Sequence, residues 1–175
     1  MKNWKRLAAL ALVLTLVLSL FTGCFGSGEE DEGEIDDRNI ATAGGSIAWP
    51  DGFDTSARRN SMQVGDTFYF AFNRTQNSTA SYFTPAGDTL TVTGQATTES
   101  ENRKEYRVTL WRETTGAREY VDTLYLTADG SCYQGSFTGL DTGSRYKIGV
   151  AYDGGSYYLS GGVTVTGLAD GSAAA

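Results

Sequence analysis

The clearest pattern in the sequence is FTGLDTGSRYKIGVAY, which occupies residues 137–152. In its second half, large apolar side chains stand at every other position: Tyr146, Ile148, Val150 and Tyr152. Such alternation is typical of a β-strand with one buried face, so residues 145–152 are predicted to form a strand. The triplet Asp141-Thr142-Gly143 before it consists of turn-forming residues. The stretch therefore predicts a tight turn that leads into a half-buried strand.

The same alternation recurs along much of the chain beyond residue 65. Six further segments show it: 66–73, 89–97, 104–113, 119–127, 131–138 and 157–166. Turn sequences separate them, such as Thr115-Gly116, Asp129-Gly130 and Asp153-Gly154-Gly155. No segment past residue 40 keeps a helical period. Short strands with short connections predict an all-β chain, folded as an antiparallel β-sandwich of about seven to eight strands.

The alternation also predicts which side chains point away from the core. In residues 104–113 the inward positions are Tyr106, Val108 and Leu110, and the outward positions include Arg107 and Trp111. In residues 119–127 the inward positions are Leu124 and Leu126, which turns Tyr125 outward. The polar side chains and two of the aromatic rings are thus expected on one exposed sheet face.

The stretch from Phe137 to Tyr152 resembles the corner between strands E and F of fibronectin type III and other immunoglobulin-like domains. In those families the corner tyrosine, here Tyr146, turns inward and its hydroxyl bonds to backbone just upstream. The resemblance implies that six of the segments serve as strands B, C, C′, E, F and G: 89–97, 104–113, 119–127, 131–138, 145–152 and 157–166. Residues 66–84 would supply the first strand, and residues 40–84 are expected to add either that strand alone or further edge strands.

The beginning of the chain has the pattern of a secretory signal. Three basic residues, Lys2, Lys5 and Arg6, precede an uncharged apolar run of 15 residues at 7–21. A membrane-spanning helix needs about 20 such residues, so a permanent transmembrane anchor is not favoured. The sequence Leu20-Phe21-Thr22-Gly23-Cys24 resembles the lipobox of bacterial lipoproteins. That resemblance implies cleavage of residues 1–23 and lipid attachment to Cys24; the alternative is ordinary secretion with Cys24 incidental.

Residues 24–45 are predicted to form a flexible tether between the lipid and the fold. Seven carboxylates fall among residues 29–37, and charge repulsion in such a run favours an extended, solvated chain. Cation binding is an alternative, but the run lacks the spacing of a calcium loop. The chain carries a net charge of -7 and no stripe of Lys and Arg, so nucleic acid is not an expected partner. The fold is predicted over residues 46–168, with its fibronectin-like part from about residue 80, and a disordered tail at 169–175.

Several kinds of chemistry are excluded by composition. Without histidine, the chain has no Ser-His-Asp or Cys-His machinery and no imidazole metal ligand. Cys132 has no partner once Cys24 carries lipid, and it is expected to be a buried, inert thiol. Five acidic residues lie in predicted loops among turn formers: Asp51, Asp54, Glu99, Glu101 and Asp153. A hydrolase that uses a carboxylate pair is therefore the less favoured alternative, and neither a cofactor nor a metal is expected.

The candidate ligand-binding residues are aromatic or lie beside aromatic residues. An outward Trp111 near Tyr125 and Arg107 forms a surface that can stack a sugar ring. The alternative, which the usual burial of large aromatic rings favours, is that Trp111 covers an edge of the sheet or packs beneath residues 46–64, where Ile47, Trp49 and Phe53 also need burial. Tyr157 and Tyr158 form a second candidate at a loop-to-strand junction. We therefore expect a lipid-anchored binding or display module on the extracytoplasmic face of a cell membrane, which recognises an envelope protein or a glycan without catalysis; a dedicated carbohydrate-binding module is the alternative.

Overall fold

The computed structural model describes residues 37–171, which form strands, turns and loops. Within this range no helix has the length and apolar character needed to cross a membrane. The predicted signal peptide at 1–23, the lipidation site at Cys24 and the acidic run of the tether up to residue 36 lie outside the described residues.

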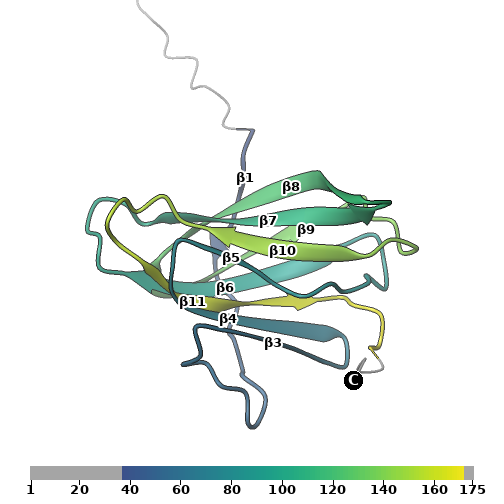
Figure 1. The fold of residues 1–175 in the computed structure, drawn as a ribbon, viewed down its shortest axis with the longest axis horizontal. Coiled ribbons are helices and arrows are strands. Elements are labelled where there is room, and N and C mark those ends of the chain that lie inside the picture. Colours follow the sequence, from purple (N-terminus) through teal and green to yellow (C-terminus); the bar gives the residue numbers. More distant parts are fainter. Residues whose placement is uncertain (1–36, 172–175) are drawn as a thin grey trace, which may run out of the picture. The chain divides into compact units, whose positions relative to one another are not determined.

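Residues 37–171 form eleven strands (Figure 1). They are β1 (Asn39–Ile40), β2 (Thr42–Ala43), β3 (Arg59–Val64), β4 (Thr67–Thr75), β5 (Asn77–Thr79), β6 (Leu90–Thr98), β7 (Glu105–Thr114), β8 (Ala117–Thr127), β9 (Asp129–Phe137), β10 (Tyr146–Ala151) and β11 (Leu159–Thr166). All seven segments predicted from alternation are strands. The sequence pattern missed β1, β2, β3 and β5, which are short or mostly polar.

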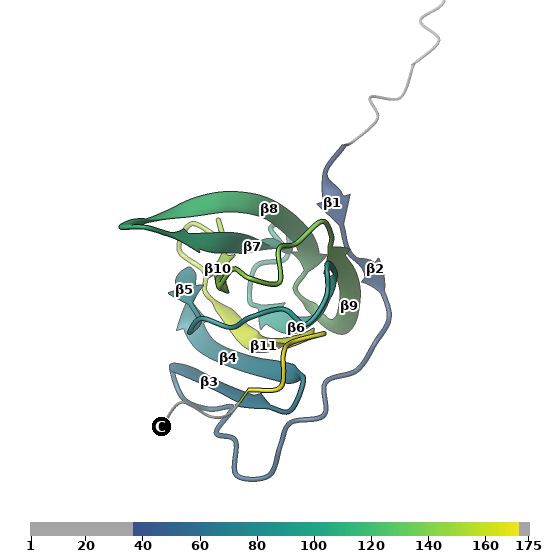
Figure 2. The same ribbon diagram turned by 90° about the vertical axis from the view of Figure 1, so that its right-hand side faces the viewer.

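The strands form two sheets that face each other across one core (Figure 2). One sheet has the order β1-β8-β7-β10-β5, and the other has the order β2-β9-β6-β11-β4-β3. All pairings are antiparallel except the short parallel contact of β1 with β8. The predicted antiparallel β-sandwich is therefore confirmed.

The order of β4 to β11 is that of a jelly roll. Counted one to eight along the chain, these strands follow the order 1-8-3-6 in one sheet and 2-7-4-5 in the other. In immunoglobulin-like domains the last strand, G, lies beside strand F. Here the last strand, β11, lies between β6 and β4 in the sheet opposite β10. The assignment of residues 157–166 to the place of strand G is therefore wrong.

The crossover from β10 to β11 has a clear structural basis. Residues 152–158 join the two strands, and this length is sufficient to span the about 10 Å between packed sheets. The buried Tyr152 anchors the connection: its hydroxyl donates to the carbonyl oxygen of Arg103 at 2.7 Å and lies 2.8 Å from Oγ1 of Thr98. Alternation in the sequence predicts which side chains are buried, but it does not predict which of the two sheets a strand joins.

The predicted tether ends earlier than residue 45. Asn39 and Ile40 pair with Leu124 and Tyr125 of β8, and β2 pairs with β9 on the opposite sheet. Ala41 between them is buried. Residues 39–43 thus pass from one sheet edge to the other and close that side of the sandwich, so they belong to the fold.

Two buried tyrosines in the core differ in how their hydroxyl groups are satisfied. The hydroxyl oxygen of Tyr146 accepts a hydrogen bond from the backbone N–H of Asp141 at 3.0 Å, which is the bond that the corner resemblance implies. The hydroxyl of Tyr106 has no hydrogen-bond partner among the described residues. Burial raises the pKa of Tyr106 because the charged phenolate would be desolvated. The Tyr106 hydroxyl lies against Gly94, where an added Cβ would overlap it.

Candidate functional site

The outer face of the β1-β8-β7-β10-β5 sheet holds most of the predicted binding residues. Trp111 on β7 pairs with Tyr120 of β8 on one side and with Lys147 of β10 on the other. Arg107, four residues earlier on β7, pairs with Tyr125 and Ala151. The predicted outward positions are therefore confirmed, and β10 is the neighbour of β7 as expected.

The Trp111 ring is held from several directions. The Arg118 guanidinium carbon lies 4.9 Å from the ring centroid, and the Tyr120 ring meets the indole edge to face at 5.9 Å. The ring extends toward Gly149, where an added Cβ would lie 3.5 Å from the indole Nε1. This distance is an ordinary van der Waals contact, so the indole lies beside the β10 backbone at this glycine. Trp111 is half-buried, whereas Tyr120 is 55% exposed.

The aromatic row continues beyond β10 to Tyr82. Lys147 places its ammonium nitrogen 4.7 Å from the Tyr82 ring centroid, and the Arg145 guanidinium lies 5.0 Å from the same ring. Because Lys147 also pairs with Trp111, it connects the two rings. We call Tyr82, Trp111, Arg118, Tyr120 and Lys147 the Trp111 surface. It presents three aromatic rings and two cations on one exposed sheet face.

Tyr125 and Arg107 lie on the same face but not on the Trp111 surface. Arg107 and Trp111 are four positions apart on β7, which corresponds to about 13 Å along a strand. The hydroxyls of Thr109 and Thr123 lie between the two sites and are 3.1 Å apart. Arg107 forms an ion pair with Asp153. The structure therefore does not bring these two candidates together with Trp111.

Tyr125 has a cationic neighbour of its own. The Arg38 guanidinium carbon lies 4.7 Å from the Tyr125 ring centroid, and Arg38 also binds Glu105 at 3.0 Å. Arg38 follows directly from the acidic segment, so the Tyr125 end of the sheet is the end where the chain enters the fold.

Residues 46–58 cover the outer face of the opposite sheet and therefore do not cover Trp111. The rings of Trp49 and Phe53 stack at 5.1 Å with an interplanar angle of 5°, and both lie 6.2 Å from Tyr69. Trp49 packs on Gly162 of β11, where an added Cβ would lie 2.7 Å from the indole Cζ2. The alternative that Trp111 packs beneath residues 46–64 is therefore wrong, because residues 46–58 cover the outer face of β4 and β11 and residues 59–64 extend that sheet as β3.

Tyr157 and Tyr158 precede β11 and lie on the surface at 45% and 49% exposure. The side-chain amide of Gln76 donates to the carbonyl oxygen of Tyr157 at 3.1 Å. Tyr158 lies near Arg74, whose guanidinium carbon is 5.9 Å from the ring centroid. Alternation does not single out Arg74, because the position of Arg74 beside Tyr158 depends on the pairing of β4 with β11.

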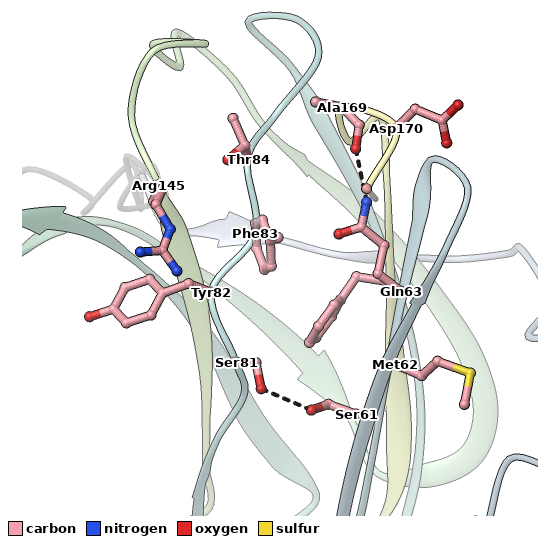
Figure 3. A pocket seen from close by; sticks show the side chains of 12 residues that line it. Ser61, Met62, Gln63, Ser81, Tyr82, Phe83, Thr84, Arg145, Ala169 and Asp170 are labelled. Atoms are coloured by element: carbon pink, nitrogen blue, oxygen red, sulfur yellow. Dashed lines mark hydrogen bonds between the residues drawn. The ribbon is translucent and has the colours of Figure 1, made fainter. Parts of the chain in front are cut away.

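A groove of about 760 Å³ opens between the edge strand β3 and residues 81–84 (Figure 3). Figure 3 shows Tyr82 and Arg145 on one side and Ser61 and Gln63 on the other. Two contacts connect its sides: the hydroxyls of Ser61 and Ser81 are 3.2 Å apart, and the Gln63 amide donates to the carbonyl oxygen of Ala169 at 2.8 Å. Tyr82 also belongs to the Trp111 surface, so the groove adjoins that surface.

Three aspartates have shifted pKa values, and each shift follows from local hydrogen bonds. The side-chain and backbone donors of Ser56 lower the pKa of Asp54, and the backbone N–H of Ser131 lowers that of Asp129. The backbone N–H of Gly143 lowers the pKa of Asp141. Hydrogen bonds to a carboxylate favour its charged form. These carboxylates therefore act as turn-stabilising acceptors.

Within residues 37–171, no three acidic or Cys side chains gather as a metal site would require. Cys132 is half-buried, so the prediction of a buried thiol is wrong. It lies on β9 opposite the exposed Gln95, on the outward-facing side of the strand, where only part of its surface is covered.

Comparison with known proteins assigns no function to these surfaces. No protein-family model matches the sequence, and no curated protein shows significant similarity to it.

Proposed function

We propose that this chain is a lipid-anchored recognition module on the extracytoplasmic face of a bacterial cell membrane, which binds an envelope glycan through the Trp111 surface without catalysis. The lipobox-like Leu20–Cys24 sequence supports the anchor, and the acidic residues 29–37 support a spacer between the lipid and the fold. The observation that carries the recognition role is the row of rings and cations on an open sheet face.

The chemistry of this row suits a sugar polymer. The C–H faces of sugar rings stack on aromatic side chains, and the cations and the tyrosine hydroxyls can bind sugar oxygens. The Trp111 ring is held in place by Arg118 and Tyr120 before any ligand arrives, so little side-chain freedom is lost on binding. A flat sheet face also gives an extended polymer access, whereas a closed pocket would not.

A protein partner is the second candidate. Trp, Tyr and Arg are the residues that most often dominate the binding energy of protein interfaces, and the Trp111 surface combines all three. Such an interface would use the same rings, so the two candidates differ in the ligand and not in the site.

Co-sedimentation with purified cell-wall polysaccharide tests the recognition role. The wild-type chain is expected to bind saturably, and Trp111→Ala should lose at least tenfold in affinity, since an aromatic anchor contributes about 1.5 kcal/mol or more. Val64→Ser is the control, because Val64 is an exposed apolar residue on the edge strand β3 of the opposite sheet, away from the Trp111 surface. Absence of polysaccharide binding, with capture of one envelope protein that Trp111→Ala abolishes, favours the protein candidate. Binding that Trp111→Ala leaves unchanged contradicts the proposed site.

The anchor is tested separately by Cys24→Ala. The thiol is the group that would carry the lipid, so this variant should leave the membrane fraction for the soluble fraction. A Cys132→Ala variant controls for loss of a thiol elsewhere in the chain. Equal membrane attachment of the wild-type and Cys24→Ala chains would contradict lipidation at Cys24.

A further inference from the structure

Five arginines of the described domain form no ion pair with a carboxylate, and two of them, Arg58 and Arg74, lie at one hollow. Arg38, Arg107, Arg112 and Arg145 each form an ion pair with a carboxylate. Arg58 makes no side-chain hydrogen bond or ion pair with the described residues, and Arg74 contacts only the Tyr158 ring. Arg58 and Arg74 line this surface hollow together, on the side of the molecule that carries β4 and β11.

The backbone at Arg74 is held in an unusual conformation. Arg74 is the one residue other than glycine with a positive φ, 49°, among residues 37–171. Its N–H donates to the hydroxyl oxygen of Ser160 at 3.0 Å, and that hydroxyl donates to Oδ1 of Asn73 at 2.8 Å. The pairing of β4 with β11 shifts register at this point. Strained residues held by surrounding hydrogen bonds are frequent at ligand sites. Here these bonds fix the backbone position from which the Arg74 side chain extends.

The hollow itself has the composition of a small ligand site. It has a volume of about 340 Å³ and is lined by Ser56, Arg58, Asn73, Arg74 and Tyr158. Tyr158 is 49% exposed, so much of its ring stays accessible. Arg74 and Tyr158 also line a second hollow of about 320 Å³, whose lining includes Glu99 and Ser160. The two hollows thus share a ring and a guanidinium.

We infer that the Arg58–Arg74 hollow binds an acidic sugar, a pyranose ring that carries a carboxylate. The two guanidinium groups supply charge and paired donors for the carboxylate. The Tyr158 ring supplies a stacking surface for the sugar, and Ser56 and Asn73 offer polar groups for its hydroxyls. Glu99 repels a carboxylate from the second hollow but accepts hydrogen bonds from sugar hydroxyls, so the acidic unit is directed to the Arg58 side.

This site is separate from the Trp111 surface, which lies on the outer face of the other sheet. Its ligand can be the terminal unit of a short acidic saccharide or one unit within a polymer, because the hollow is open at the surface. A single sugar has few atoms to bind, so its affinity is expected in the millimolar range, on the order of 1 mM.

NMR titration of the full ¹⁵N-labelled chain in detergent micelles tests the inference with sodium glucuronate as the probe. Saturable shifts are expected at residues 56–58, 73–74 and 158–160, with weaker effects from glucose or sodium acetate alone. Arg74→Gly removes the guanidinium and suits the positive φ, so the fold should persist while affinity falls about tenfold or more. Arg58→Gln should act in the same direction. Arg59→Gln is the matched control, because the Arg59 side chain instead donates to the Thr79 carbonyl at 3.3 Å.

Each outcome of the titration bears on the inference. If acetate or a triglutamate peptide binds with the same affinity as glucuronate, the hollow binds carboxylates without recognising the sugar ring, and the assignment is overturned. Equal affinity for glucose would overturn the role of the arginines. Tighter binding of an oligoglucuronate than of glucuronate would identify a polymer as the source, and equal binding a terminal unit. Retention of glucuronate binding by Trp111→Ala would separate this site from the Trp111 surface.

Discussion

Replacing each of two buried tyrosines by phenylalanine should change stability in opposite directions. Both rings are 1% exposed, so each substitution removes one hydroxyl from the core and leaves a similar ring. The Tyr146 hydroxyl accepts the Asp141 N–H at 3.0 Å, whereas the Tyr106 hydroxyl has no partner among the described residues. The pair thus compares a satisfied with an unsatisfied polar group in the same sandwich.

The expected magnitudes follow from the contacts of each hydroxyl. Loss of the Tyr146 hydrogen bond should lower the free energy of unfolding by about 1 kcal/mol, since Asp141 is exposed and water can solvate its N–H. An unsatisfied buried hydroxyl costs about 1–3 kcal/mol. Removing it at Tyr106 loses some of the close packing on Gly94, worth on the order of 0.5 kcal/mol. The Tyr106→Phe chain should therefore gain about 1 kcal/mol, a difference of about 2 kcal/mol between the variants.

Urea denaturation followed by fluorescence measures this difference directly. A separation of about 2 kcal/mol corresponds to about 1 M in the midpoint for a domain of this size, with Tyr106→Phe the more resistant. Equal m-values, the slopes of unfolding free energy against urea concentration, in the wild type and both variants would show that the substitutions act on the stability of the folded state. Destabilisation of Tyr106→Phe by as much as Tyr146→Phe would refute the assignment of an unsatisfied hydroxyl at Tyr106.

Three further predictions concern the surface and the turns. Gly162→Ala should lower the free energy of unfolding by about 2 kcal/mol or more in a thermal melt, because the added Cβ would lie 2.7 Å from Trp49 and 2.9 Å from the Phe70 carbonyl oxygen. Gly87→Ala is the control and should be nearly neutral, because an added Cβ there meets open space. Equal melting temperatures of the two variants would contradict the packing of Trp49 on Gly162. Cys132 should react with a thiol reagent in the native protein, though more slowly than a free thiol, and failure to react without denaturant would argue for full burial. Asp54, Asp129 and Asp141 have folded pKa values below the unfolded value of 3.8, so their stabilising contribution is complete above that pH and is lost as the pH falls through the folded values. A denaturation midpoint that is unchanged from pH 5 to pH 2 would argue against these turn hydrogen bonds.

The amino-acid pattern was sufficient to place the strands that have one apolar face. Phe68, Phe70 and Phe72 align in β4, and all three are buried. Strand β3, with the sequence RNSMQV, lacks such a face because Met62 and Val64 point to solvent and Ser61 and Gln63 point to the groove. Strand β5 has only three residues, all polar. Local pattern cannot identify strands whose pairing is imposed by their neighbours.

The candidate sites likewise contain some residues that alternation predicts and others that only tertiary pairing brings into the site. The outward position of Trp111 follows from alternation in β7, and its pairing with Lys147 follows from the adjacency of β7 and β10. Arg118 and Tyr82 join the surface through a β-bulge at Trp111 and a loop after β5, which alternation does not report. Arg58 and Arg74 are 16 positions apart and meet because β3 and β4 form a hairpin. Their approach depends on tertiary pairing that the sequence alone does not reveal.

Hydrogen exchange of the full chain, with and without purified cell-wall polysaccharide, tests most directly whether the Trp111 surface is the recognition site. The proposal predicts slower exchange with ligand in residue 82 and in residues 109–120 and 147–149, which carry or border that surface. It predicts no change in residues 46–58, which cover the opposite sheet. Saturated binding with protection confined to the opposite sheet, or with no protection around Trp111, would contradict it.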